Sequence, residues 1–164
     1  MRRVCLRARV PVTVGATYDR LSDFAVYPDL APSVLRVRVF DDVLEDGRRR
    51  SCRSSWEVTF RNGVLCWEEE DEFDFDRRIV SFQQIEGDLE VLKGSWSVRE
   101  AASGGSEVCF EAEFDLGLPG LEDFLEPVAQ RALEDNVREL MTRLFDAATI
   151  DEREEVPDGP PTGS

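Results

Sequence analysis

Apolar and polar residues alternate with a period of two along most of the chain between residues 33 and 117, a pattern typical of half-buried strands. Residues 3–10 alternate in the same way, so a further strand is expected at the N-terminus. The connections between the runs are short, which predicts an antiparallel sheet built from hairpins. Turn-forming residues separate the runs at Asp46-Gly47, Asn62-Gly63, Gly87-Asp88 and Ser103-Gly104-Gly105.

Two regions have helical periodicity instead. Thr13 is placed to cap a helix that carries Val14, Tyr18, Leu21 and Phe24 at roughly helical spacing. After Gly117 the period changes to 3.6 and predicts a long amphipathic helix, with a kink or a break at Pro127. The apolar stripe of that helix is Leu121, Phe124, Leu125, Val128, Ala132, Leu133, Val137, Leu140, Met141, Leu144 and Phe145.

This order of elements predicts an α+β fold with one domain over residues 1–150. A curved antiparallel sheet of about seven strands has one apolar face, and the long C-terminal helix covers that face. Leu35, Val37 and Val39 are expected to share the inner face of their strand. Residues 151–164 are acidic and rich in Pro and Gly, so we expect a disordered tail there.

The composition of the chain argues against some kinds of binding partner. The chain of 164 residues has a net charge of −15, which argues against binding nucleic acid or an anionic membrane. It contains no apolar run long enough for a membrane span, and its first residues do not resemble a signal peptide. The four cysteines form no CxxC pair, and we predict a reduced, cytoplasmic protein.

The chain has no histidine, and this limits its chemistry. A Ser-His-Asp or Cys-His mechanism is excluded, and no histidine can complete a zinc site. Acid–base chemistry would have to use carboxylates, tyrosine, lysine, cysteine, water or the substrate itself. No metal and no organic cofactor is expected.

Residues 65–76 read LCWEEEDEFDFD, and seven of these twelve residues are carboxylates. Asn62-Gly63 favours a type I′ hairpin turn, and the register that follows places Ser54 opposite Asp71. The apolar residues of the two strands then fall on the same face, which supports this register. On the other face lies a solvated ladder of Glu68, Glu70, Glu72, Asp74 and Asp76.

Glu69 and Asp71 fall on the apolar face, with Trp67 and Phe73. Their Cα atoms should be roughly 6.5–7 Å apart, and burial of two neighbouring carboxyls raises at least one pKa. One structural explanation is a bulge that turns both side chains outward, and another is salt bridges to arginine. The functional explanation is a polar patch inside an aromatic cavity. Candidate partners for the two carboxyls are Ser54, Trp56, Trp96, Lys93 and the arginines.

Five stretches of the chain resemble the START-related superfamily called SRPBCC, and in particular its polyketide cyclase/dehydrase branch. They span about residues 4–145, and their order and spacing are more specific than any single stretch. The resemblance implies a helix-grip fold, in which the sheet wraps the long helix and encloses a deep ligand cavity. The stretches are VPVTVGATYDRLSDFAVYPDLAPSVLRVRV, VLCWEEEDEFD, GDLEVLKGSWSV, GGSEVCFEAEFDLGLPG and EPVAQRALEDNVREL.

The resemblance also implies site residues. Tyr27 stands where the polyketide branch has an aromatic at the cavity mouth, Trp67 and Trp96 match cavity tryptophans, and Leu89 and Leu92 match apolar wall positions. The hydrophobic pattern adds further candidates for the wall: Trp56, Val58, Phe82, Phe110, Phe124 and Val128.

The match fails at the centre of the expected site. The key arginine of the polyketide branch falls at Asp71, and its neighbouring serine falls at Glu69. The mouth phenylalanine and tyrosine of that branch fall at Ala31 and Val34. The aromatase mechanism therefore does not transfer directly, and the candidate catalytic residues are Asp71, Glu69 and Ser54.

Three functions fit the sequence. In the first, a poly-β-keto substrate is cyclised and dehydrated, with Asp71 or Glu69 as the acid–base group and an acyl carrier protein as the candidate donor. In the second, the cavity carries a lipid, a quinone or a natural product, for transport or self-resistance, and the carboxyls bind its polar or cationic group. In the third, the tryptophans only fill a packed core. The resemblance favours the first function.

Overall fold

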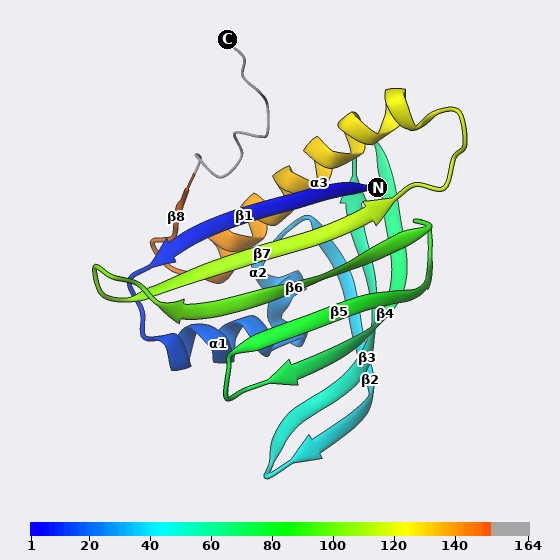
Figure 1. The fold of residues 1–164 in the computed structure, drawn as a ribbon. Coiled ribbons are helices and arrows are strands. Elements are labelled where there is room, and N and C mark those ends of the chain that lie inside the picture. The colour runs from blue at the N-terminus through cyan, green and yellow to red at the C-terminus, as the bar shows by residue number, and fades with distance from the viewer. Residues whose placement is uncertain (152–164) are drawn as a thin grey trace.

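The computed structural model describes residues 1–151, and residues 152–164, which hold most of the predicted tail, lie outside the described part. The described chain forms one eight-stranded antiparallel sheet with helices on one side (Figure 1). This confirms the predicted α+β class. The strands, in chain order, are β1 (Arg2–Val10), β2 (Val34–Glu45), β3 (Arg48–Phe60), β4 (Gly63–Asp74), β5 (Ile79–Gly87), β6 (Val91–Glu100), β7 (Ser106–Asp115) and β8 (Thr149–Ile150).

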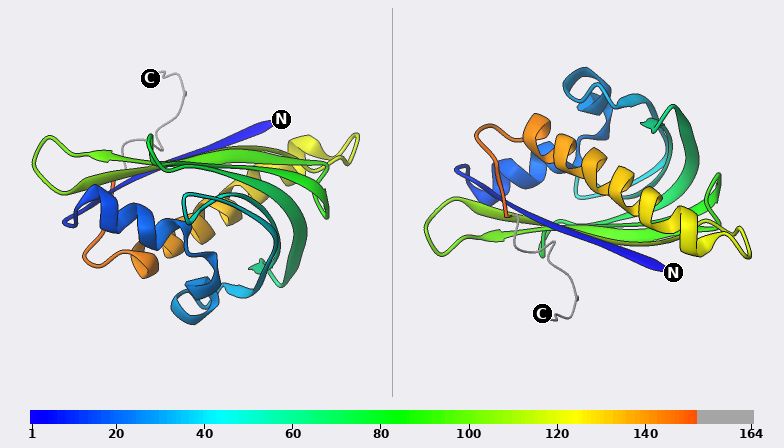
Figure 2. Two further views of the ribbon diagram at one scale, coloured as in Figure 1. Left: turned by 90° about the horizontal axis from the view of Figure 1, so that it is seen from below. Right: turned by 90° about the horizontal axis from the view of Figure 1, so that it is seen from above.

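Strands β2 to β7 each pair with the next strand in the chain, and the N-terminal strand β1 lies between β7 and the short strand β8. The sheet runs β2-β3-β4-β5-β6-β7-β1-β8, so β1 pairs with the last long strand, β7. The sheet curves strongly at β2, β3 and β4 (Figure 2). Its concave side faces the helices, which are α1 (Val14–Ser22), the 3₁₀ turn η1 (Phe24–Val26), α2 (Tyr27–Leu30) and α3 (Glu122–Leu144).

The hairpin between β3 and β4 turns one residue earlier than predicted. Phe60 pairs with Gly63, so the two turn residues are Arg61 and Asn62, and Arg61 has φ 60°. A positive φ at the first central residue fits the twist that a two-residue hairpin requires. The predicted register was therefore wrong by two residues, and Ser54 pairs with Glu69 rather than with Asp71. Because a shift of two keeps each side chain on its face, the predicted division of the acidic run into two faces is confirmed.

The helix after β1 begins as predicted and ends earlier. The Thr13 hydroxyl accepts a hydrogen bond from the Ala16 amide at 3.3 Å, which caps α1. The helix ends at Ser22, and Phe24 begins η1 instead of lying on the last turn of α1.

The long C-terminal helix α3 is one element of 23 residues, so the predicted break at Pro127 was wrong, and the kink stays a prediction. The second half of its apolar stripe is buried, including Val137 and Met141. The first half is exposed, and Phe124 keeps 78% of its surface accessible. The helix runs at an angle to the sheet, as Figure 2 shows, and the apolar side chains of its stripe are buried mainly on its later turns.

One strand position also differs from the prediction. Leu35 was expected on the inner face with Val37 and Val39, but it is 48% exposed. The pairing of β2 with β3 shifts between Val34 and Arg36, and this bulge takes Val34 inside and turns Leu35 outward.

Candidate functional site

The inner face of β4 carries two buried carboxyl groups, Glu69 at 4% and Asp71 at 1% exposure. They lie two residues apart on one strand and therefore on one face, together with Leu65 and Phe73. The pairing of β4 with β5 is irregular between Glu68 and Glu69, yet both carboxyls stay inside. Within residues 1–151, neither forms a salt bridge to arginine or lysine. Neither structural explanation considered from the sequence therefore applies.

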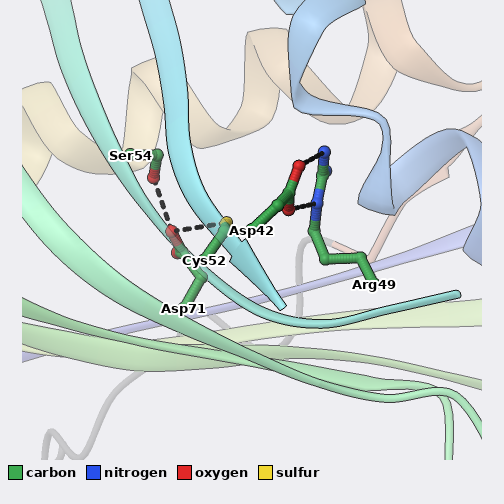
Figure 3. A network of polar contacts seen from close by, with 5 residues as sticks. All are labelled: Asp42, Arg49, Cys52, Ser54 and Asp71. Atoms are coloured by element: carbon green, nitrogen blue, oxygen red, sulfur yellow. Dashed lines mark hydrogen bonds and ion pairs between the residues drawn. The ribbon is translucent and has the colours of Figure 1, made fainter. Parts of the chain in front are cut away.

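A hydrogen-bond network from β3 holds Asp71 in place (Figure 3). The Ser54 hydroxyl donates to Asp71 Oδ2 at 2.5 Å, and the Trp56 indole N–H donates to Ser54 Oγ at 2.8 Å. The Cys52 thiol lies 3.6 Å from the same Asp71 oxygen. The second oxygen of Asp71, Oδ1, is buried with no hydrogen-bond partner in the described chain. Sequence reasoning therefore found Ser54, whereas it did not assign Cys52 to the site.

Glu69 is held differently. The Trp67 indole N–H donates to Glu69 Oε1 at 2.7 Å, and Ser54 Oγ lies 3.4 Å from Glu69 Oε2. Glu69 and Asp71 also influence each other's protonation, because they are neighbouring carboxyls on one buried face.

Burial raises the pKa of both carboxyls. Burial, and next the hydrogen bond and the negative charge of Asp71, raise the pKa of Glu69 well above its ordinary value. Burial also raises the pKa of Asp71, but hydrogen bonds from Glu69, Ser54 and Cys52 oppose that rise. Both carboxyls therefore hold a proton more strongly than isolated carboxyls do, and the effect is larger for Glu69.

Arg49, whose positive charge acts on Asp71, is bonded to another carboxylate. Its guanidinium makes two bonds to Asp42, at 2.5 and 3.0 Å, and Figure 3 shows it turned toward Asp42. Arg49 lowers the pKa of Asp71 through its charge, but burial has the larger effect. Within residues 1–151 the carboxyl pair therefore has no direct ion pair.

Replacement of Glu69 by glutamine should make the stability of the protein less dependent on pH. A carboxyl whose pKa is higher in the folded state contributes stability that is fully present below its unfolded pKa, near 4.5, and is lost as the pH rises through the folded value. Each pH unit between the two values costs about 1.4 kcal/mol. Denaturant unfolding at pH 5, 6.5 and 8 should show Glu69→Gln gaining stability relative to the wild type as the pH rises.

The matched control for that measurement is Glu72→Gln, a change of the same size at an exposed position of the same strand. Its stability should run parallel to that of the wild type from pH 5 to pH 8. A Glu69→Gln curve that also runs parallel to the wild type would contradict the raised pKa.

Beside Glu69 lies a largely apolar cavity of about 100 Å³. Glu69 is the one charged residue among the described residues of its wall. The Trp56 and Trp67 rings stack at 6.0 Å, and Trp96 meets Phe110 edge-to-face at 4.7 Å. The structure brings eight of the predicted wall residues together here: Tyr27, Trp56, Val58, Trp67, Phe82, Leu92, Trp96 and Phe110.

Other predicted residues lie elsewhere. Leu89 is buried outside the wall, and Phe124 and Val128 are exposed on the first turns of α3, so they do not belong to this cavity. Asp71 and Ser54 lie behind Glu69 and are not part of the wall. The binding and catalytic roles of the residues that do converge stay predictions.

The wall also contains residues that the sequence did not point to. Phe24 enters from η1, and Asn136 enters from α3 while its amide donates to the Thr59 carbonyl at 2.8 Å. Leu133, Val137 and Leu140 come from the predicted apolar stripe, which indicated burial but gave no sign of a cavity. The spacing of apolar residues shows which face of a helix is buried. It does not show whether the sheet packs against that face or leaves a cavity beside it.

A curved antiparallel sheet closed by a long helix over an apolar cavity defines a ligand-binding domain of the helix-grip type. The sequence matches the family described as "Polyketide cyclase / dehydrase and lipid transport" over residues 10–141. The chain therefore belongs to this family, whose members bind hydrophobic small molecules. No curated protein matches the sequence.

Solved structures share the fold at low sequence identity. A protein of Thermus thermophilus is 22% identical with a TM-score of 0.76, over 87% of this chain and 94% of that one. The Zhui aromatase/cyclase from Streptomyces sp. R1128 is 17% identical with a TM-score of 0.75, over 87% and 90%. A START superfamily protein from Mycobacterium smegmatis is 15% identical with a TM-score of 0.71, over 87% and 96%.

Within residues 1–151, no helix is both long and apolar enough to span a membrane. The prediction of a cytoplasmic location stays a prediction.

Proposed function

We propose that the protein binds a poly-β-keto or polyketide-derived aromatic molecule in this cavity and promotes its cyclisation and dehydration. Glu69 carries the proposal, because it is the charged group on the wall of an aromatic cavity and burial raises its pKa. Active sites commonly use burial to tune a carboxyl toward acid–base work near neutral pH.

The proposed chemistry moves two protons from carbon to oxygen through Glu69. In the reactive form Glu69 is ionised, its own proton rests on Asp71, and the Glu69 carboxylate takes the acidic proton from a carbon between two carbonyls. The resulting enolate attacks a second carbonyl and closes the ring, and the alkoxide that forms takes this proton from Glu69 and becomes a hydroxyl. Glu69 then takes the remaining proton from the same carbon and gives it to the hydroxyl, which leaves as water while the double bond forms, so Glu69 is ionised again.

Three observations support this assignment. The family includes cyclases and dehydrases by its description, and one structure of similar fold is an aromatase/cyclase. The stacked tryptophans and the Trp96–Phe110 pair offer flat surfaces to a planar substrate. The network from Ser54 and Trp56 fixes Asp71, so Asp71 can receive and return the proton of Glu69 without moving.

The size of the cavity implies that it opens. A volume of about 100 Å³ has room for about three waters, at about 30 Å³ each, whereas ligand pockets commonly have 300–1,000 Å³. One side of the wall is formed by η1, α2 and α3, and we propose that these helices move away from the sheet to admit the substrate. Delivery by an acyl carrier protein stays a prediction.

The second candidate function is binding of a cationic ligand without catalysis. The observation in its favour is the lack of an ion-paired cation at the carboxyl pair within the described chain. An ammonium group would supply that charge, and the faces of Trp56 and Trp67 would add cation–π attraction.

The experiment that tests the proposed function incubates the protein with a reactive poly-β-keto thioester and profiles the products by mass spectrometry. The expected result is a shift from spontaneous products toward one cyclised, dehydrated product, which is lost with Asp71→Asn and Glu69→Gln. A product distribution equal to that of a protein-free reaction would refute the cyclase function. Tight binding of an aromatic amine together with that result would favour the cationic carrier.

A further inference from the structure

A second cluster of chemically reactive side chains lies on the opposite face of the sheet. Cys5 on β1 pairs directly with Glu111 on β7, and Cys109 precedes Glu111 by two residues on the same strand. Alternate residues share a face, so the three side chains project together from the outer surface. The inner neighbours Leu6, Val108 and Phe110 are buried in the core, which fixes both strands beneath the cluster.

The three side chains are already close together. The two sulfur atoms and one carboxylate oxygen all lie within 4.8 Å of one another, and Cys109 Sγ is 3.9 Å from Glu111 Oε2. Both cysteines are half-buried and Glu111 is exposed, so the cluster is open to solvent on one side. Neither cysteine is in a disulfide.

We propose that Cys5, Cys109 and Glu111 form a binding site for a thiophilic d¹⁰ cation of the Zn²⁺ or Cd²⁺ type. The inference is independent of the cavity and of its proposed chemistry.

The geometry fits such a cation after a small adjustment. Zinc–sulfur bonds of about 2.3 Å at tetrahedral angles place two sulfurs roughly 3.8 Å apart. The two sulfurs lie within 4.8 Å of each other, so they need to approach by at most about 1 Å, a change of the size that a rotation about χ1 of a cysteine produces. Three protein ligands leave the fourth position to a water molecule, on the side where Glu111 is exposed.

Arginine side chains near the cluster can balance the charge of the metal site. Two thiolates and a carboxylate carry three negative charges, and a divalent cation leaves one of them uncompensated. Arg3 lies 3.5 Å from Glu111, and Arg7 lies 3.7 Å from Glu107 on the same face, so positive charge is at hand to offset it. Across the sheet from β7, the residues paired with Cys109 and Glu111 are Ser97 and Ser95.

The donor atoms determine which metal fits. Two cysteine sulfurs are soft ligands, which favour Zn²⁺ and Cd²⁺ over the oxygen-preferring Mg²⁺ and Ca²⁺. The thiols release their protons to solvent when the metal binds, so binding should weaken as the pH falls.

The test is a titration of the chelator-treated full chain with Cd²⁺, in a reductant that contains no thiol. Binding is followed by the ultraviolet charge-transfer absorption of cadmium thiolates, and stoichiometry with Zn²⁺ by native mass spectrometry. We expect one metal per chain. Cys5→Ser and Cys109→Ser should each weaken binding at least about tenfold, and Glu111→Gln should weaken it less.

The chain supplies its own control. Cys66 is an exposed cysteine on β4, away from the cluster, so Cys66→Ser should bind Cd²⁺ as the wild type does. Absence of a charge-transfer band in the wild type would overturn the proposal, and so would a band that persists in both cluster variants or disappears with Cys66→Ser. Circular dichroism of the serine variants confirms that any loss of binding occurs in a folded protein.

Discussion

Replacing Glu69 with glutamine should lower the rate of ring closure by about 10²–10⁴-fold, the usual contribution of a general acid–base group. Glutamine keeps the size of the side chain and can still accept the hydrogen bond that Trp67 donates at 2.7 Å. It cannot take or return a proton. Single-turnover rates measured on a reactive poly-β-keto thioester give the comparison directly, because they separate chemistry from product release.

The pH dependence of that rate distinguishes catalysis from positioning. The wild-type rate should depend on the titration of the carboxyl pair, and the residual rate of Glu69→Gln should lose that dependence. Glu72→Gln changes the exposed ladder of the same strand and should leave both the rate and its pH profile unchanged. A Glu69→Gln protein that is folded and as fast as the wild type would remove Glu69 from the chemistry.

Gly94 on β6 should tolerate no side chain, and Gly94→Ala should cost about 3 kcal/mol or more. A Cβ built at this position would lie 2.1 Å from the Glu111 carbonyl oxygen and 2.7 Å from the Ala112 Cα atom. Both are backbone atoms of β7, so relief requires the two strands to separate. Thermal unfolding should show a fall in Tm of roughly 10 °C.

Gly15 offers the matched control for that change. It lies in the first turn of α1, and a Cβ there would meet nothing within 4 Å. Gly15→Ala should therefore be neutral or stabilise the protein by up to about 1 kcal/mol, because alanine favours the helix. Equal losses at the two glycines, or no loss at Gly94, would show that β6 and β7 are not held as closely as described.

Local patterns predicted much of the sheet correctly. The hydrophobic pattern placed Trp56, Val58 and Phe110 on the inner side of the sheet, and all three are buried. The alternation of apolar and polar residues along β4 placed Glu69 and Asp71 on the inner face, even though the predicted register with β3 was wrong by two residues. The predicted faces remained correct because the turn moved by one residue, which shifts the pairing by two residues. A shift of two leaves each side chain on its own face of the sheet.

Other predictions failed where distant segments meet. The stripe of α3 suggested that Phe124 and Val128 lie over the core, yet the oblique path of the helix leaves both exposed. Leu35 was placed inside by alternation, and a bulge that depends on the pairing with β3 turned it out. Neither the crossing direction of a helix nor the position of a bulge is encoded in the residues of one element alone.

The sequence by itself therefore determined the long strands, the C-terminal helix, the inner face of most strand positions and the burial of an acidic pair, because these follow from the period of apolar residues along one segment. The tertiary structure decided the rest. It showed that Asp71 is held by Ser54 while Glu69 faces the cavity, that Arg49 is engaged by Asp42, and that the described cavity is small. It also brought Cys5 to Cys109, more than one hundred residues away in the chain. Such contacts depend on strand pairing across the whole sheet, and no local pattern reports that pairing.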